Sequence, residues 1–458
     1  MAPMSSIPTP PTPQVLQLIN WILDPLAYMD TNQRRLGDLF RIRPWVLDWL
    51  LVSHPDSLRY LLTHDTQELS APGEVNAILK PLLGEHSVIT LSGDPHRTRR
   101  KLIMPPFHGD RLKVYGDLMQ RITHEVMATV APGDRLMARE TTQKISMRVI
   151  LQTVFGLYQG ERYQRLETLL KARLDMMAKP VASTMIFFPI LQRDWGKWSP
   201  GHKIQAIAAE IDAILLAEIR ERRANPHPNR TDILSLLLLA QDEQGQGLSD
   251  QELRDELMTL LVAGHETTAT AMAWGLYWAH RLPQVQQSLQ AELTSHPNAD
   301  PMGLTKLPYL SAFCNETLRL YPVAMLTFAR QAQQPFELEG YPIAAGEVLV
   351  GCIYRLHRRE DLYPQAQEFR PERFLERQYS AFEFMPFGAG ARRCIGSALA
   401  MMEMKIVLGT LLQEYDLALT SHRPALPQRR GITLGLKDDV ELVVRAKRSP
   451  QPSLVPMA

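Results

Sequence analysis

The 458-residue sequence predicts a mainly α-helical chain with a small β region. Apolar residues recur at helical spacing over long stretches, whereas the strand-like segments are short and bounded by turn residues. The longest helical stretch begins at Ser249, which is placed to form a capping box with Glu252, and meets no proline before Pro283. A helix of about 33 residues would be about 50 Å long, which is enough to cross the whole domain.

The composition is that of an ordinary soluble globular enzyme. Hydrophobic residues make up 45% and charged residues 22% of the chain, and the formal net charge is +1. This balance excludes a general attraction to nucleic acid or to an anionic membrane. The three cysteines, Cys314, Cys352 and Cys394, are too few for a disulfide framework, which favours a reducing, cytoplasmic location.

The chain divides into three parts. Residues 1–37 form a Pro-rich leader and an N-terminal helix, residues 38–448 form the main domain, and we expect the tail at 449–458 to be disordered. The leader lacks the charged and apolar regions of a secretory signal. Its apolar stretch, Val15 to Tyr28, is interrupted by polar residues and a proline, so we expect no transmembrane anchor, and a peripheral membrane contact stays open.

The main domain begins with short strands at 38–43 and 46–53 and a helix at Pro55–Thr63. The later elements are predicted from apolar residues at helical spacing and from the alternation of apolar and polar residues in strands. Helices are expected at Leu112–Val130, Glu140–Phe155, Arg162–Phe188, His202–Arg223, Asp232–Ala240 and Pro308–Leu320, and strands at Leu326–Gln331, Phe336–Leu338 and Val348–Tyr354.

Two stretches are candidates to cover a substrate cavity. Residues 67–91 have no clear period, and either line the substrate or merely connect two elements. The apolar run 176–188 and the loop with Trp195 and Trp198 are either core or a lid over an apolar cavity. The sequence leaves both pairs of alternatives open.

A glycine-rich loop surrounds the third cysteine, in the sequence F-M-P-F-G-A-G-A-R-R-C-I-G-S. Cys394 ends this loop just before a helical run, Ser397 to Leu412. Backbone N–H groups of the turn and the positive end of the helix would stabilise a thiolate and lower its pKa. With Arg392 and Arg393 beside it, such a thiolate could bind a haem iron while a guanidinium binds a propionate. A small buried cysteine in a helix-capping loop is the alternative.

The spacing F-G-x-G-x-R-x-C-x-G resembles the haem-binding loop of the cytochrome P450 family of haem-thiolate monooxygenases. It is formed by Phe387, Gly388, Gly390, Arg392, Cys394 and Gly396. The resemblance implies a single-domain, mostly helical fold with a long central helix over a haem b (iron protoporphyrin IX). It also implies that Cys394 binds the iron and that Phe387, Gly388 and Arg392 lie at the cofactor. The chain looks most like soluble bacterial members, particularly cyanobacterial ones associated with long-chain fatty acids.

The middle of the long helix has the sequence L-V-A-G-H-E-T-T-A, which contains residues that disfavour a helix. Gly264 costs up to about 1 kcal/mol relative to alanine, and the Thr267 hydroxyl can bond back to a carbonyl one turn earlier. Either a ligand approaches the backbone here or another helix crosses closely. The stretch resembles the family's oxygen-binding groove, which implies that Gly264 lies at the haem and that Thr267 and Glu266 are catalytic, the first holding dioxygen and the second relaying protons. We interpret His265 as a packing residue.

The sequence S-G-D-P-H-R-T-R-R-K-L opens a helix with His96 and Arg100 on one face. Both side chains could donate to a buried anion, or the helix could be a solvated basic surface. In the family this helix carries a pair of residues that bind a haem propionate, which implies that role for His96 and Arg100. A family arginine on a later strand contacts the second propionate, and Arg330 occupies that place. An acidic electron carrier could dock on the outward basic face.

A second set of charged residues has a structural interpretation. Glu316 and Arg319 lie three apart on a helix and could pair, although such surface pairs usually contribute little. The family uses this pair as a buried brace behind the cysteine loop, closed by the arginine of P-E-R-F. Arg373 occupies that place here, so the resemblance implies that the three residues retain the haem and take no part in the chemistry.

These motifs imply a monooxygenase that uses dioxygen and electrons from a separate ferredoxin or flavodoxin system. The candidate lining segments are mostly apolar, so we expect an apolar small-molecule substrate. They are Leu69–Leu91, Met176–Phe188, Leu257–Thr268, Val323–Phe328 and the terminal strands. A long-chain fatty acid is the first hypothesis, and a terpenoid or alkane is the second. No arginine in these segments is an obvious carboxylate clamp.

Three other interpretations stay open. A peroxide-driven or isomerase-type relative would use the same haem without electron carriers, although such relatives usually depart from the acid and alcohol pair seen here. A haem-based sensor or carrier would have no turnover. A structural protein would simply bury Cys394. In every case we expect a cytoplasmic monomer that binds no nucleic acid.

Overall fold

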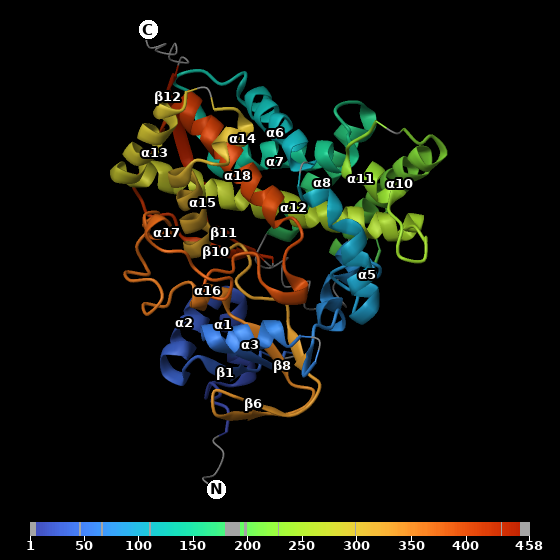
Figure 1. Cartoon of the computed structure of the whole chain (residues 1–458), viewed down its shortest axis with the longest axis vertical. Coiled ribbons are helices and arrows are strands. Elements are labelled where there is room, and N and C mark those ends of the chain that lie inside the picture. The colour runs from blue at the N-terminus through green and yellow to red at the C-terminus, as the bar shows by residue number, and fades with distance from the viewer. Residues whose placement is uncertain are drawn as a thin grey trace.

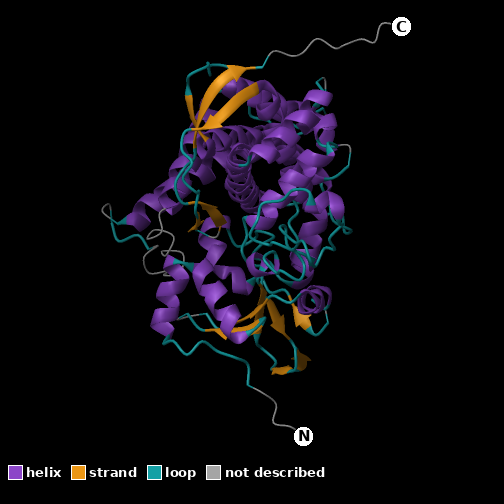
Figure 2. Ribbon diagram, turned by 90° about the vertical axis from the view of Figure 1, so that its left-hand side faces the viewer, coloured by secondary structure: helices purple, strands orange, loops and turns teal. Residues whose placement is uncertain are grey.

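The structure is a computed structural model, in which residues 6–448 are described apart from 45–46, 66, 110, 179–192, 197–198, 228, 298 and 432. Helices fill the middle of the molecule, and most strands lie toward its two ends (Figures 1 and 2). The predicted class, mainly α with a small β region, is confirmed.

The helices agree with the predicted ranges to within a few residues at most ends. None of those in the described part of the chain is both long and apolar enough to cross a bilayer. The α-helices are α1 (Gln14–Leu23), α2 (Pro25–Leu36), α3 (Pro55–Thr63), α4 (Lys80–Leu83), α5 (Gly93–Ile103), α6 (Arg111–Met127), α7 (Ala138–Phe155), α8 (Glu161–Ala178), α10 (Pro200–Ala224), α11 (Ile233–Leu239), α12 (Asp250–Arg281), α13 (Pro283–Ser295), α14 (Pro301–Leu304), α15 (Pro308–Leu320), α16 (Ile353–Leu356), α17 (Arg373–Glu376) and α18 (Ser397–Glu414). Short 3-10 helices are η1 (Glu74–Leu79), η2 (Pro105–Phe107) and η5 (Gly390–Arg392).

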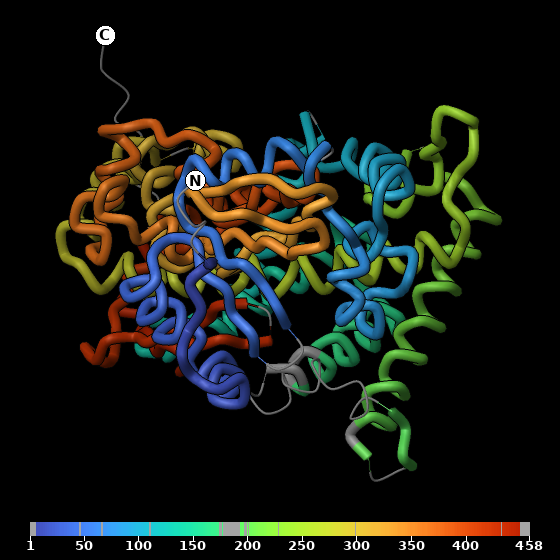
Figure 3. The backbone as a smooth tube through the Cα atoms, turned by 90° about the horizontal axis from the view of Figure 1, so that it is seen from below, coloured from blue at the N-terminus to red at the C-terminus, as the bar shows by residue number. Residues whose placement is uncertain are grey.

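The largest sheet joins segments from both halves of the chain. Its order is β1 (Leu39–Ile42), β2 (Trp49–Val52), β8 (Val348–Gly351), β5 (Arg330–Ala332) and β3 (Leu69–Ser70). The β2–β8 pair is parallel and the other pairs are antiparallel. Figure 3 shows the blue N-terminal strands beside the orange strands from later in the chain. The smaller sheets pair β4 (Arg135–Met137) and β9 (Tyr415–Leu419) with β12 (Glu441–Lys447), β6 (Phe336–Leu338) with β7 (Tyr341–Ile343), and β10 (Pro427–Arg430) with β11 (Thr433–Leu436).

Helix α12 crosses the middle of the molecule, as predicted (Figure 1). Its capping box is present: the Ser249 hydroxyl accepts from the Glu252 N–H, and the Glu252 carboxylate accepts from the Ser249 N–H at 2.9 Å. Helix α7 packs along it, and a Cβ atom at Gly264 would lie 2.7 Å from Cδ1 of Ile150. A close helix crossing therefore accounts for this glycine, and the place of Gly264 at the haem stays a prediction.

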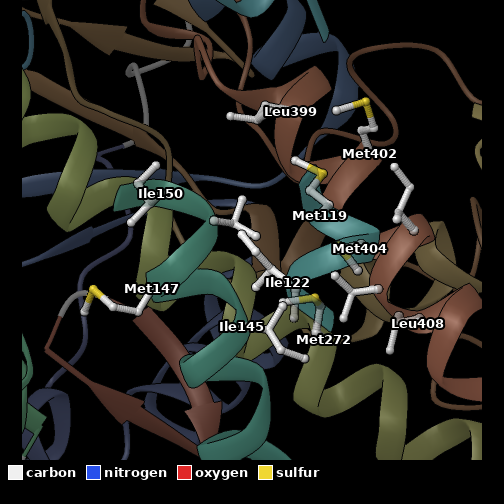
Figure 4. Close-up of a cluster of buried hydrophobic side chains, with 14 of the residues drawn as sticks. Met119, Ile122, Ile145, Met147, Ile150, Met272, Leu399, Met402, Met404 and Leu408 are labelled. Atoms are coloured by element: carbon white, nitrogen blue, oxygen red, sulfur yellow. The ribbon is translucent and has the colours of Figure 1, made fainter. Parts of the chain in front are cut away.

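A cluster of buried apolar side chains holds four helices together, namely α6, α7, α12 and α18 (Figure 4). Burying one large apolar side chain stabilises the fold by about 1.5–3 kcal/mol. Helix α18 begins three residues after Cys394, so this core fixes the cysteine loop relative to α12. The labelled members are Met119, Ile122, Ile145, Met147, Ile150, Met272, Leu399, Met402, Met404 and Leu408.

Several segments differ from the prediction. Residues 67–91 contain β3, η1 and α4, which are each too short to show a period in the sequence. The strand predicted at Leu326–Gln331 is observed at Arg330–Ala332, and Leu326 makes only an isolated bridge, with Cys352. The leader contains two helices, which are separated at Asp24 before a proline. Most of the proposed lid, and the tail at 449–458, lie outside the described residues.

Candidate functional site

The loop before α18 folds tightly around Cys394. Gly388 and Gly390 have φ values of +66° and +68°, a conformation that favours glycine. A Cβ atom at Gly390 would lie 2.4 Å from the carbonyl oxygen of Leu62, so glycine also allows the loop to approach α3. The Cys394 N–H donates to the Phe387 carbonyl at 3.0 Å. These features present the cysteine directly before the N-terminus of α18.

The sulfur of Cys394 lies in a recess. Its side chain is exposed, yet surrounding protein atoms raise the pKa of the thiol above its ordinary value. Nearby guanidinium groups of Arg100 and Arg393 act in the opposite direction but are outweighed. The lowered pKa that the sequence predicted is therefore wrong for the metal-free thiol, because desolvation was not visible in the sequence. The two other cysteines are fully buried, and burial raises their pKa values to about 12.

Four basic side chains converge beside this loop, and we call them the cationic cluster: His96, Arg100, Arg330 and Arg392. Burial, the three guanidinium groups of the cluster and that of Arg97 lower the pKa of His96 to about 3, so its imidazole is neutral. Among the described residues one carboxylate pairs with the cluster, namely Asp65, which lies 3.1 Å from Nη2 of Arg330. Like charges gathered with so little compensation can bind a further anion.

A short stretch of α12 is accessible although the turns on either side are buried. Ala263 is exposed and Thr267, one turn later, is partly exposed. The Thr267 hydroxyl donates to the Ala263 carbonyl at 2.5 Å. Glu266 points to α7, where it accepts from Nε2 of Gln143 at 2.6 Å and from Nη2 of Arg139 at 3.1 Å. The predicted catalytic hydroxyl of Thr267 is thus accessible, whereas the predicted catalytic carboxylate of Glu266 accepts hydrogen bonds from two side chains of α7.

A family model described as cytochrome P450 matches residues 7–439. The chain belongs to the cytochrome P450 family. Its relatives include two provisionally named proteins of Mycobacterium tuberculosis. Cytochrome P450 135B1 is 32% identical over 98% of this chain and 94% of that protein, and cytochrome P450 137 is 33% identical over 89% and 85%.

Solved cytochrome P450 structures have the same fold. Retinoic acid-bound cyanobacterial CYP120A1 has a TM-score of 0.83 at 24% identity, covering 96% of this chain and 99% of that chain. The heme domain of cytochrome P450DA has a TM-score of 0.84 at 23% identity, covering 98% of both chains. The single-domain cytochrome P450 fold, implied earlier by four short motifs, is therefore confirmed.

Cytochromes P450 are monooxygenases that bind haem b through a cysteine thiolate. The residues of this P450 fit that group. Cys394 is accessible, and a coordinating thiol is deprotonated by the metal even when burial raises its own pKa. The cationic cluster lies close enough for Arg100 to act on the Cys394 thiol and suits the two propionate carboxylates of a haem. Gly388 has open space where a Cβ atom would stand, which allows a flat group to approach.

Two arginines of the P450 also fasten the cysteine loop. Arg392 donates to the backbone carbonyls of Ala71 at 2.6 Å and Val88 at 2.8 Å, and to that of Leu91. Arg330 is fully buried, and its Nε has no hydrogen-bond partner among the described residues. Arg392 therefore ties the loop to the 67–91 segment, and its predicted contact with a propionate stays a prediction.

The predicted brace is present behind the loop. Glu316 and Arg319 are fully buried and Arg373 nearly so. Arg319 forms two hydrogen bonds to Glu316, at 2.6 and 2.8 Å, and Arg373 approaches the same carboxylate at 3.1 Å. Arg319 also donates to the carbonyls of His357 and Ala366. The brace is thus a closed network, unlike the surface pair that is the common outcome of this spacing.

Sequence reasoning missed the partners of these residues. Arg139 and Gln143, four apart on one face of α7, position Glu266, and Asp65 positions Arg330. The four-residue spacing of Arg139 and Gln143 was a weak signal that they share a face of α7. Their common partner, Glu266, lies over 120 residues away and could not be predicted from the sequence. His265 is buried, as expected for a packing residue.

Proposed function

We propose that this P450 hydroxylates a long-chain fatty acid, using dioxygen and electrons from a separate ferredoxin or flavodoxin system. The observation that supports the substrate class is the mostly apolar hollow beside α12. Five of its six lining residues are apolar, and the sixth is Arg173. A lining of this kind suits a ligand with a long apolar part.

In this proposal Cys394 supplies the thiolate ligand and the cationic cluster binds the propionates. His96 donates to one propionate together with Arg100, and Arg330 contacts the other. The neutral state of His96 supports this role, because an imidazole N–H can still donate without adding another buried charge. The remaining proposed cofactor contacts are Phe387, Gly388, Gly264 and Arg392.

Two residues of α12 would manage protons. Haem, when bound, supplies the activation of dioxygen and the transfer of one oxygen atom to the substrate. Glu266 is partly exposed, so its carboxylate can exchange protons with solvent after releasing one of its two donors. Thr267 can turn its O–H from the Ala263 carbonyl toward a ligand beside α12 and so donate a hydrogen bond that would hold dioxygen in place.

We also propose a cytoplasmic monomer that meets an acidic electron carrier on the basic surface near Cys394. Arg97, Lys101 and Arg393 are exposed there. Arg97 and Lys101 pair with exposed acids, and such surface pairs contribute little to stability, so a partner can replace them. Charge complementarity of this kind increases the rate of association at low salt.

The test is an optical titration of the purified ferric protein with hexadecanoic acid, hexadecane, a cyclic terpene and retinoic acid. Retinoic acid, which the cyanobacterial structure contains, combines a terpenoid body with a carboxylate. We expect hexadecanoic acid to shift the iron toward high spin at the lowest concentration. A stronger response to the terpene or the alkane would overturn the fatty-acid proposal and leave the monooxygenase intact.

Turnover then separates the remaining alternatives. With ferredoxin, its reductase and dioxygen, the fatty acid should yield a hydroxylated product. Product formed only with added peroxide would indicate a peroxide-driven enzyme, and binding without any product would indicate a sensor or carrier.

A further inference from the structure

A buried arginine lines the small hollow beside α12. Arg173 lies on α8, and the hollow is bounded by side chains from α4, α7, α8 and α12. Every other residue of the lining is apolar, so the guanidinium is the one polar group presented there by the described residues. The lining consists of Leu82, Met147, Leu170, Arg173, Leu261 and Val262.

Arg173 has few partners for a buried cation. Its side chain is 4% exposed. Nη2 makes two long contacts, 3.4 Å to the Pro81 carbonyl and 3.3 Å to the Leu82 carbonyl. Nε and Nη1 are buried without any hydrogen-bond partner among the described residues. Burial lowers the pKa of Arg173 to about 10, so the guanidinium is still charged at neutral pH.

Among the described residues, the one acid that acts electrostatically on Arg173 is bound to another arginine. Asp212 influences Arg173 electrostatically, but its Oδ1 accepts from Nε of Arg254 at 2.8 Å. Arg254 also contacts Asp255 at 2.8 Å. Arg222 shows the usual solution for a buried arginine, since this comparably buried side chain holds two carboxylates. Arg173 therefore carries a charge that no acid of the described residues neutralises, and two of its nitrogen atoms are free to donate hydrogen bonds.

The hollow borders α12 shortly before the proposed reaction site. Val262 precedes Thr267 by five residues, which is about 7.5 Å along the helix and about 140° around its axis. A long, flexible ligand with its polar end at Arg173 would therefore have to curve around α12 for its apolar part to reach Thr267. A guanidinium binds a carboxylate through two parallel hydrogen bonds, and Nε and Nη1 are the donors left unused.

We propose that Arg173 anchors the carboxylate of the substrate, so that this P450 selects long-chain acids over alcohols and esters of the same chain length. The inference rests on the proposed fatty-acid hydroxylation and adds the residue that recognises the acid. It also supplies the carboxylate clamp that the sequence did not reveal, because Arg173 reads as one of several charged residues on an amphipathic helix.

The first experiment needs no variant. Haem-loaded wild-type protein is titrated with hexadecanoic acid, its methyl ester and hexadecanol, by optical spectroscopy and by calorimetry. We expect the acid to bind at least tenfold more tightly than the other two. Equal affinity for the three ligands would overturn the anchor, and no binding of any of them would instead remove the fatty-acid function on which it rests.

The second experiment compares Arg173→Gln with wild type. We expect at least a tenfold loss of affinity for hexadecanoic acid, an unchanged affinity for hexadecanol, and an intermediate result for Arg173→Lys. Arg165→Gln is the matched control, since Arg165 lies on α8 but is exposed and paired with Glu210. Circular dichroism and haem content establish that each variant is folded. Full affinity for the acid in folded Arg173→Gln contradicts the proposal while the proposed function stands.

Discussion

The brace and the cationic cluster are both built from buried arginines, yet they are organised in opposite ways. In the brace, two guanidinium groups share one carboxylate and give their other donors to backbone carbonyls. In the cationic cluster, three guanidinium groups lie near an imidazole, and among the described residues only Arg330 of the four is paired with a carboxylate, that of Asp65. The brace is complete without a ligand, so its role is structural. The cationic cluster has charge left over for an added anion, so we expect its role to be binding.

The largest effect should come from breaking the brace. Glu316→Gln leaves two buried guanidinium groups without an acid, and we expect a loss of about 3–5 kcal/mol in the free energy of unfolding. Urea denaturation measures this. Glu376→Gln is the control, because its pair with Arg370 is largely exposed and should contribute less than about 1 kcal/mol. Equal losses in both variants would show that the brace is no stronger than a surface pair.

Removing a charge from the cationic cluster should not lower the free energy of unfolding of the haem-free protein, in contrast to a change in the brace. Arg100 makes no salt bridge within the described residues, and its removal relieves repulsion. We expect Arg100→Gln to leave the haem-free protein as stable as wild type or more so. Haem binding should weaken by about 1.5–3 kcal/mol, the contribution of a charge-assisted hydrogen bond. Transfer of haem to a competing globin measures this, with exposed Arg97 on the same helix as the control.

Acid should destabilise the haem-free protein through His96. The folded pKa of about 3 lies below the ordinary value of 6.5, so the unfolded chain takes up the proton first. The stability due to this group is therefore fully present above pH 6.5 and decreases toward pH 3, by up to about 1.4 kcal/mol per pH unit. His96→Gln should flatten this dependence in urea titrations. Bound haem should also flatten it, because propionates raise the pKa of His96.

The smallest effect on stability should come from Thr267→Ala, at less than about 0.5 kcal/mol, since among the described residues the hydroxyl bonds only within its own helix. Haem and substrate should still bind, while reducing equivalents are diverted to peroxide. Thr268→Ala is a matched control, because that buried hydroxyl makes the same type of bond, to Gly264. Fully coupled product formation in Thr267→Ala would contradict the role given to Thr267.

Local signals in the sequence predicted the elements well. Helix α12 was visible because its capping box and the next proline are both read from nearby residues. The brace was predicted from the resemblance to the cytochrome P450 family. The spacing of Glu316 and Arg319 alone would equally have predicted a weak pair on the surface. The short elements between 67 and 91 were missed because a two-residue strand and single helical turns carry no period.

Properties that depend on distant neighbours could not be predicted. Gly264 had two explanations, and only the packing of Ile150 against it shows the helix crossing. The direction of the Cys394 pKa was wrong because the sequence shows adjacent arginines but not desolvation. Arg173 did not stand out in the sequence. What marks it is that Nε and Nη1 have no hydrogen-bond partner among the described residues, and this is known only from the folded structure.

The bonds of Arg392 have a consequence for how this protein is made. They join the cysteine loop to the carbonyls of residues 71, 88 and 91, which the ribosome delivers some 300 residues earlier. At about 5–20 residues per second, roughly 15–60 s separates the synthesis of the two segments. Until the second segment emerges, the first can contact α5 and α12 but not Arg392, and the thiol does not yet exist. If Cys394 binds the iron as proposed, haem can be captured only after translation has passed residue 394.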